Sequence, residues 1–135
     1  MQLSTTLRNT LADAIDTSCN TGTNAFARFY TASLATLLAS AACSNPAFGA
    51  ASNGVITLDV APAVEDTSPA AAGTCVRLGF YTSTAATSGA SVFMLGVATT
   101  GAPDVTMSNN VIATTDTVQI SSLTITVPAG TPDVT

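Results

Sequence analysis

The side chains that perform most enzyme chemistry are scarce in this chain. Its 135 residues include no histidine and no lysine, and the three cations are all arginine. Serine and threonine are abundant, but a hydroxyl nucleophile needs an activating base, and that base is most often histidine. Glu65 and Asp66 are adjacent, so they would point apart on a strand and would be solvated in a loop. We therefore expect no enzymatic activity.

The cysteines do not form a metal-binding pattern. Cys19, Cys43 and Cys75 are odd in number, share no ligand spacing, and have no histidine to complete a zinc site. Three part-buried thiols in a chain that folds in a reducing cytoplasm are the simpler interpretation. Zinc is not expected.

Four oxygen-bearing side chains in the last third of the chain are the remaining candidates for metal chemistry. Asp104, Asn109, Asn110 and Asp116 together carry the carboxylate and amide oxygens that Ca²⁺ prefers. Their spacing matches no known calcium loop, so we interpret them as turn formers. The sequence thus predicts neither a metal nor a cofactor.

Charge is sparse and negative. The net charge is −5, and charged residues make up 8% of the chain, against about 25% in typical proteins. Arg8, Arg28 and Arg77 lie far apart, so we expect no nucleic-acid partner. Anionic membrane surfaces are disfavoured for the same reason, and no apolar run is long enough to span a bilayer. A surface rich in Thr, Ala, Ser and Gly favours packing against neighbouring subunits.

One amphipathic helix is expected at the N-terminus, over residues 1–18. Leu3, Leu7, Leu11 and Ile15 recur every four residues, and Ser4 or Thr5 is expected to cap the helix. Turn-forming residues 17–24 end it. Two roles stay open for its apolar stripe, which either covers one end of a sheet core or docks on a neighbouring subunit.

Short segments of strand character, separated by turn formers, fill residues 25–128. The strongest is 117–127, and we expect earlier strands to pair with it or pack over it. Its apolar phase flips at Ser121 and Ser122, which indicates either a bulge or burial of both faces. Other strands are expected at 25–30, 55–60, 74–81, 91–97 and 105–107. Small-residue turns are expected at 82–89 and 101–104, and an exposed excursion at 61–73.

Two features of the strand region have open interpretations. Residues 37–43 fit a short buried strand, although Leu34, Leu37 and Leu38 also fit helical spacing. Arg28 and Arg77 fall within strands, where each is either paired with an aspartate or part of an interface.

Five short motifs follow one another along the chain. They are 3–9 (Leu-Ser-Thr-Thr-Leu-Arg-Asn), 28–31 (Arg-Phe-Tyr-Thr), 45–55 (Asn-Pro-Ala-Phe-Gly-Ala-Ala-Ser-Asn-Gly-Val), 72–78 (Ala-Gly-Thr-Cys-Val-Arg-Leu) and 120–128 (Ile-Ser-Ser-Leu-Thr-Ile-Thr-Val-Pro). In this order they resemble small virion proteins encoded in the structural operons of tailed bacteriophages. The motifs span nearly the whole chain. The resemblance favours a strand at 37–43.

The resemblance implies a fold and a role. The implied fold is mainly β, an antiparallel β-sandwich of jelly-roll-like build with one N-terminal α-helix, and a barrel stays open. We expect a single domain over 1–135, made of the helix at 1–18, the sandwich at 25–128 and a tail at 129–135. The implied role is that of a capsid decoration (cement) protein, which bridges major capsid subunits on an icosahedral head.

The expected working unit is a homo-oligomer, most plausibly a trimer, on the virion surface. Closed cyclic symmetry is the usual outcome for like subunits, and a trimer suits local three-fold positions of a shell. The candidate interface residues are Leu3, Leu7, Leu11, Phe93, Met94 and Leu95. A tail or neck component is the alternative, as is a carbohydrate-binding module of a tail fibre. Sugar platforms favour Trp and Tyr, however, and this chain has no Trp and only Tyr30 and Tyr81.

Overall fold

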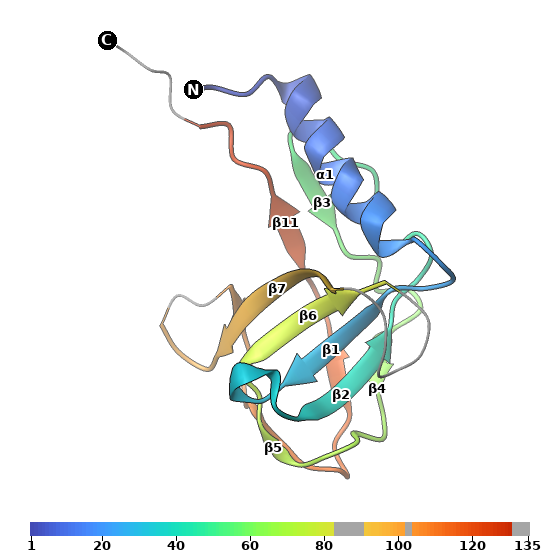
Figure 1. The fold of residues 1–135 in the computed structure, drawn as a ribbon, viewed down its shortest axis with the longest axis vertical. Helices are drawn as coiled ribbons and strands as arrows, with labels where there is room; N and C mark the ends of the chain where they lie inside the picture. Colours follow the sequence, from blue (N-terminus) through green and yellow to red (C-terminus); the bar gives the residue numbers. More distant parts are fainter. Residues whose placement is uncertain (83–90, 102–103, 131–135) are drawn as a thin grey trace.

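A computed structural model describes residues 1–82, 91–101 and 104–130 of the chain. Most of the expected turn at 82–89, part of the turn at 101–104 and most of the tail at 129–135 lie outside these residues. One α-helix and eleven short strands are described (Figure 1). Their bounds are α1 Thr5–Cys19, β1 Phe26–Tyr30, β2 Leu37–Ala42, β3 Val55–Thr57, β4 Val64–Asp66, β5 Gly73–Thr74, β6 Arg77–Tyr81, β7 Ser91–Ala98, β8 Val105–Thr106, β9 Val111–Ile112, β10 Val118–Ile120 and β11 Thr124–Thr126, with a 3-10 turn at Ala32–Leu34.

A five-stranded sheet in the order β2-β1-β6-β7-β8 dominates the fold. Its strands pair antiparallel except β7 and β8, which are parallel, so the sheet is mixed. The other strands form three two-stranded pairs, β10-β4, β11-β3 and β5-β9. A mainly β fold with one N-terminal helix is therefore confirmed. The described strands show no sandwich or jelly-roll, and the expectation of purely antiparallel pairing was wrong.

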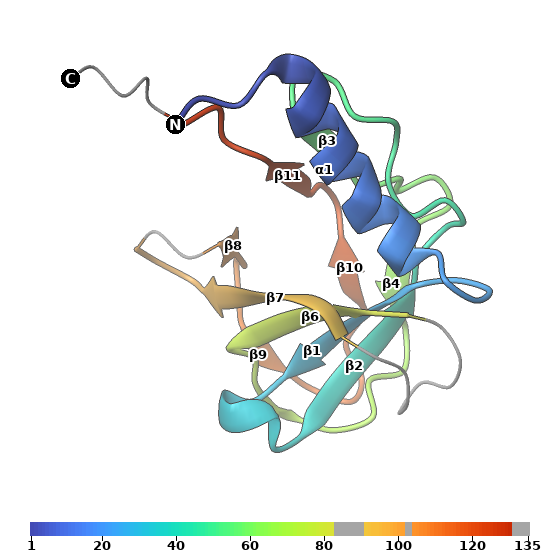
Figure 2. The same ribbon diagram turned by 45° about the horizontal axis from the view of Figure 1, so that its top comes forward.

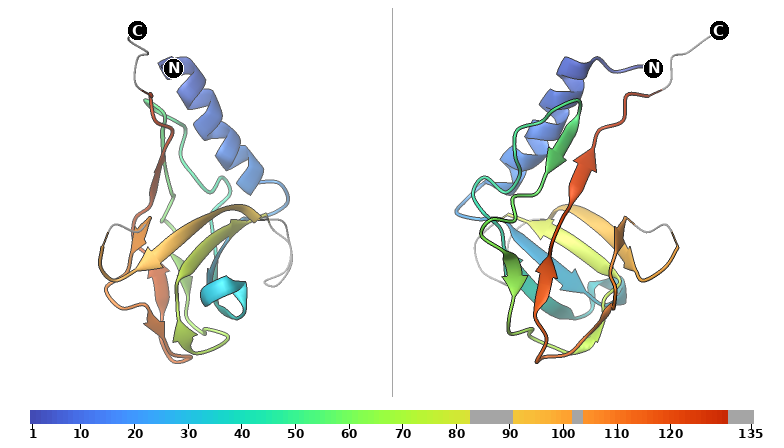
Figure 3. Two further views of the ribbon diagram at one scale, coloured as in Figure 1. Left: turned by 60° about the vertical axis from the view of Figure 1, so that its left-hand side comes forward. Right: turned by 180° about the vertical axis from the view of Figure 1, so that it is seen from behind.

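The two faces of the sheet differ because side chains alternate along a strand. Ala27 and Phe29 of β1 and Leu78 and Phe80 of β6 point to one side and are buried there; we call this the inner face. Strands β4 and β10 lie over this inner face and are in front of the sheet in Figure 3, right. Phe80 stacks on Phe93 with ring centroids 4.7 Å apart. The opposite side, which carries Arg28, is called the outer face below.

The segment expected to organise the fold is divided into two strands. Residues 118–120 form β10 and pair with β4, whereas residues 124–126 form β11 and pair with β3. The phase flip at Ser121 and Ser122 marks the break between them, so it is neither a bulge nor a strand buried on both faces. Neither strand joins the five-stranded sheet. The expectation that earlier strands assemble on this segment holds only for β3 and β4.

The segments 61–73 and 37–42 both contain strands. The segment at 61–73 contains β4, whose Val64 is buried against β10, so describing the whole of it as an exposed excursion was wrong. Residues 37–42 form strand β2, and the helical spacing of the leucines was misleading. Tertiary pairing with β1 outweighs local helical periodicity there.

Helix α1 lies beside β3 at one end of the sheet (Figures 1 and 2). Its N-cap is Ser4, one of the two expected residues, and the Ser4 hydroxyl oxygen accepts the N–H of Leu7 at 3.2 Å. Within the described residues, no helix has the length and apolar character needed to cross a membrane.

Replacing Ser4 by alanine is expected to lower the free energy of unfolding by about 1 kcal/mol, because a helix N–H loses its acceptor. Urea unfolding followed by circular dichroism at 222 nm measures the change. Ser4→Asp keeps an acceptor and is expected to restore the lost stability. Equal losses in both variants would contradict this role of Ser4.

Candidate functional site

The polar side of α1, not its leucine side, faces the rest of the protein. Four side-chain oxygens spaced along the helix accept backbone N–H groups of the segment 47–54, which we call the latch segment. The donors and acceptors are Ala47 N to Asn20 Oδ1 (3.0 Å), Phe48 N to Asp16 Oδ1 (2.8 Å), Ala51 N to Asp13 Oδ1 (2.7 Å) and Gly54 N to Asn9 Oδ1 (2.7 Å). These bonds hold the helix with its polar side inward.

The remaining charge on the helix is also directed inward. Arg8 donates from Nε to the carbonyl oxygen of Val127 at 2.8 Å, and its side chain fills the space beside Gly54. Gly54 has a φ of +77°, and a Cβ there would lie 2.8 Å from Arg8 Nε, so only glycine fits this turn. All three charged residues of α1, Arg8, Asp13 and Asp16, are therefore hydrogen-bonded to backbone groups of other segments.

The opposite side of α1 is uncharged and exposed. Leu7 and Leu11 retain 45% and 43% of their accessible surface. With Ala14 and Ser18, which follow at helical spacing, they form a stripe that we call the outer stripe of α1. A leucine stripe normally faces the core. Here the core side of the helix combines the inward polar residues with Ala12 and Cys19, both fully buried, and with Ile15, the fourth residue of the expected stripe, which is partly buried against the core.

The six candidate interface residues do not form one surface. Leu3 is partly buried beside the C-terminal segment, and its N–H is bonded to Ala129 O at 2.8 Å. Phe93 and Leu95 pack against the core on the inner face. Met94 lies on the outer face, where its sulfur contacts the Tyr81 hydroxyl at 3.8 Å. Of the six, Leu7 and Leu11 are the exposed ones.

The outer face of the sheet carries an aromatic cluster around a buried arginine. The Arg28 guanidinium carbon lies 4.6 Å from the ring centre of Tyr81, and Arg28 is only 1% exposed. The rings of Tyr30 and Tyr81 are 6.0 Å apart. Burial, followed by a hydrogen bond that the Tyr81 hydroxyl makes with Tyr30, raises the pKa of Tyr81. At Gly79 a Cβ would lie 2.5 Å from Met94 Sδ, so the absence of a side chain leaves room for Met94 and Tyr81 to pack over this position.

Sequence reasoning did not find this cluster. The two tyrosines are distant in sequence and meet because β1 and β6 are neighbours, with Phe26 opposite Tyr81 in the register. The shared phase of Phe26, Arg28 and Tyr30 in β1 was the available signal. The second mid-strand arginine, Arg77, is exposed and donates to Val76 O at 3.3 Å.

The four candidate calcium ligands all serve as local hydrogen-bonding groups. Asp104 Oδ2 accepts Gly96 N at 2.8 Å, Asn109 Oδ1 accepts Val111 N at 2.9 Å, and Asp116 Oδ2 accepts Ala113 N at 2.7 Å. Asn110 donates to Cys75 O at 3.0 Å. No group of three or more metal-binding side chains occurs in the described part of the chain. The interpretation as turn formers is confirmed for Asn109 and Asp116, whereas Asp104 and Asn110 instead bond backbone groups of β7 and of the segment before β6.

The adjacent carboxylates lie on β4, not in a solvated loop. Asp66 accepts Ser40 N at 2.8 Å through Oδ2 and Ser68 N at 2.9 Å through Oδ1. Glu65 is exposed. The two carboxylates therefore have separate surroundings, as expected for neighbours on a strand.

All three cysteines are buried free thiols. Burial, reinforced by the neighbouring Cys43 and Asp16, raises the pKa of Cys19 to about 12. Burial raises the pKa of Cys43 to about 11, although a hydrogen bond from the backbone of Ala27 acts in the opposite direction. These thiols are protonated at neutral pH and are poor nucleophiles, because the thiolate is the reactive form.

The raised thiol pKa values predict how stability depends on pH. Below pH 9 both states bind the proton, so the thiols leave stability unchanged. Above pH 9 the unfolded thiols ionise before Cys19 and Cys43 do, so stability falls as pH rises toward 11–12. We expect a loss of about 1 kcal/mol for each thiol between pH 8 and pH 10. Urea titrations of the wild type and of Cys43→Ala measure it, and an equal pH dependence in both would contradict the assignment.

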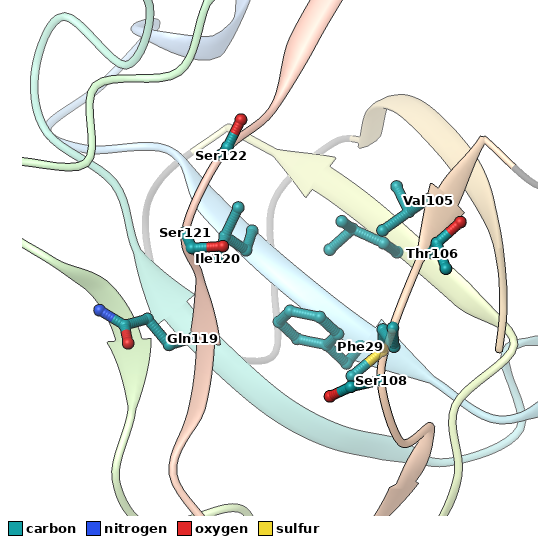
Figure 4. Close-up of a pocket in the computed structure, with 10 residues that line it drawn as sticks. Phe29, Val105, Thr106, Ser108, Gln119, Ile120, Ser121 and Ser122 are labelled. Atoms are coloured by element: carbon teal, nitrogen blue, oxygen red, sulfur yellow. The ribbon is translucent and has the colours of Figure 1, made fainter.

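A hollow opens between β8 and β10 over the inner face of the sheet (Figure 4). Its volume is ≈ 190 Å³, and Phe29, Leu78 and Ile120 form its floor. Its rim is polar and consists of Thr106, Ser108, Gln119, Ser121 and Ser122. The serines of the phase flip are thus rim residues, a role that the sequence pattern did not indicate.

No protein-family model, curated protein or solved structure matches this chain.

Proposed function

We propose that the chain is a structural virion protein, a capsid decoration (cement) protein that stabilises an icosahedral bacteriophage head by bridging major capsid subunits. The observation that carries this proposal is the orientation of α1. Its three charges are bonded to the protein's own backbone, whereas Leu7 and Leu11 face outward. An exposed apolar helix stripe without charge is suited to being covered by another protein.

The composition supports an assembly protein. Only 8% of the residues are charged, and threonine, alanine and serine side chains lose little entropy when a neighbour covers them. Contacts of this kind are individually weak, but a shell repeats them many times, and multivalency multiplies modest affinities. The motif resemblance to small virion proteins of tailed phages points to the same class.

The working unit in this proposal is a homo-oligomer, a trimer at local three-fold positions of the shell, with the outer stripe of α1 as its self-interface. Leu7 and Leu11 provide apolar contact area, and Ala14 and Ser18 allow close approach of helices. Closed cyclic symmetry then buries the same stripe in each copy. The outer face of the sheet, with Tyr81 and Met94, is left for the major capsid protein. Tyrosine, arginine and methionine are enriched at such interfaces.

The jelly-roll-like sandwich belongs to this proposal as well. In that reading β4 and β10 are the part of a second layer that covers the inner face.

Rebinding to particles tests the proposal. Particles of the encoding phage that assemble without the protein are incubated with purified chain, and bound copies are counted by quantitative mass spectrometry. We expect saturable binding at a fixed ratio to the major capsid protein, and genome release at a higher temperature after rebinding. Binding confined to tails would instead favour a tail or neck component, and absence of binding to any particle would contradict a virion role.

A further inference from the structure

The hollow between β8 and β10 is one end of a longer groove. A second hollow of ≈ 350 Å³ adjoins it and shares Met107, Ser108 and Gln119 with the first. One wall of the combined groove is formed by residues 116–122, and the other by residues 105–112. Strand β10 with its flanking residues, 117–122, gives this wall a length of about 20 Å. This length suits a chain of linked units more than a single small molecule.

The rim of the groove is neutral and rich in groups that both donate and accept hydrogen bonds. Thr106, Ser108, Gln119, Ser121 and Ser122 are all exposed, and within the described residues none of these side chains is hydrogen-bonded to another protein group. Asn109 and Thr117 continue the rim in the second hollow. Hydroxyl and carboxamide groups match ligand hydroxyls, which also donate and accept.

Charge at the groove excludes anionic ligands. Among the described residues, no cation lines either hollow, so a phosphate or sulfate group would find no counter-charge there. Asp116, at the far end, is the one carboxylate among the described lining residues, and it already accepts Ala113 N. A neutral ligand is therefore favoured.

The floor is apolar and includes an aromatic ring. Phe29, Ile120 and Val105 point into the first hollow from three different strands, as Figure 4 shows. Phe29 and Ile120 are only 2% and 8% exposed, so they present a small apolar surface at the bottom of the hollow. A ligand with hydroxyls at its edge and C–H groups on its face would satisfy the rim and cover the floor at once. A pyranose ring has both properties.

We infer that the groove between β8 and β10 binds a neutral oligosaccharide. Ser108 and Ser121 hydrogen-bond sugar hydroxyls, and one ring lies over Phe29 and Ile120. This binding role goes beyond the cement function and does not depend on it. It also places sugar recognition away from Tyr30 and Tyr81, which lie on the opposite face of the sheet.

Amide chemical shifts of the full-length chain test the inference. The probes are maltohexaose, cellohexaose and chitohexaose, each titrated to about 10 mM, with hexagalacturonate as the anionic comparison. We expect at least one neutral probe to shift the amides of residues 105–108 and 119–122 with millimolar or tighter affinity. Hexagalacturonate is expected to shift none of them.

Variants separate this role from general effects on folding. Ser108→Ala and Ser121→Ala are expected to weaken binding at least tenfold together while the thermal midpoint stays within about 2 °C. Thr124→Ala, an exposed threonine outside the groove, is the matched control and should bind normally. The inference is overturned if no neutral probe shifts these amides, if the shifts fall elsewhere, or if the uncharged strand peptide acetyl-Thr-Val-Thr-Val-Thr-amide binds there while the sugars do not.

Discussion

The double substitution Leu7→Glu and Leu11→Glu is expected to convert the oligomer to a monomer. Each leucine is nearly half exposed in the single chain, so its loss costs little folding energy. In the oligomer both would be buried, and a buried unpaired carboxylate is strongly unfavourable. At about 2 kcal/mol for each position, the association constant falls about a thousandfold. Sedimentation velocity at several protein concentrations measures this change.

Two controls distinguish loss of the interface from a general effect of added charge or of misfolding. Thr6→Glu and Thr17→Glu add the same charges to exposed positions of α1 outside the outer stripe and are expected to leave the oligomer intact. Circular dichroism of the leucine variant should match the wild type. If the wild-type chain is monomeric at all concentrations, or if the leucine variant still assembles, the outer stripe is not the self-interface.

Removing the two helix carboxylates that bond the latch segment is expected to destabilise the fold. In Asp13→Ala with Asp16→Ala, the N–H groups of Phe48 and Ala51 lose their acceptors. Phe48 is only 1% exposed, so water cannot readily replace the lost acceptor. An unsatisfied buried donor costs about 1–3 kcal/mol, and we expect a total loss of about 2–4 kcal/mol in the free energy of unfolding. Urea unfolding measures it.

The matched variant is Asp13→Asn with Asp16→Asn, which removes the charges but keeps both Oδ1 acceptors. It is expected to retain most of the stability. If alanine and asparagine variants lose the same amount, charge and not hydrogen bonding holds the helix, and the proposed orientation of α1 has a different cause. If neither variant loses stability, the latch contacts do not hold the helix.

Local patterns in the sequence predicted local structure well. The Ser4 cap, the strand at 25–30 and the hairpin of β6 with β7 follow from capping chemistry and alternation. The turn at Asn53 and Gly54 is also as expected, with φ values of 52° and 77°. These features depend on neighbours in the chain, and the residues that define them are close together in sequence.

The orientation of α1 was not determined by its pattern. Periodicity identified a stripe of leucines separated by polar residues. It left open whether the stripe faces the sheet core or a neighbouring subunit. The deciding partners are backbone N–H groups of residues 47–54, at least 27 positions away for each bond. A side-chain acceptor can face inward where a distant segment provides N–H donors. The periodicity of the helix alone does not predict where that segment lies.

The break between β10 and β11 at Ser121 and Ser122 likewise depends on segments that are distant in sequence. The phase flip was visible, yet its cause depended on which strands pair on either side. Pairing with β4 before the flip and with β3 after it places both serines at an open edge, where they become the rim of the groove. The groove also needs Thr106 and Ser108 from another segment, so the sequence alone could not assemble it.

A density map of the intact particle tests whether the chain is a decoration protein. We expect density for this chain on the outside of the head, at repeated positions between major capsid subunits. We also expect α1 at the contact between neighbouring copies and the outer face of the sheet against the shell. Density for the chain only in the tail or neck, or particles whose heads contain none of it, would contradict the decoration role.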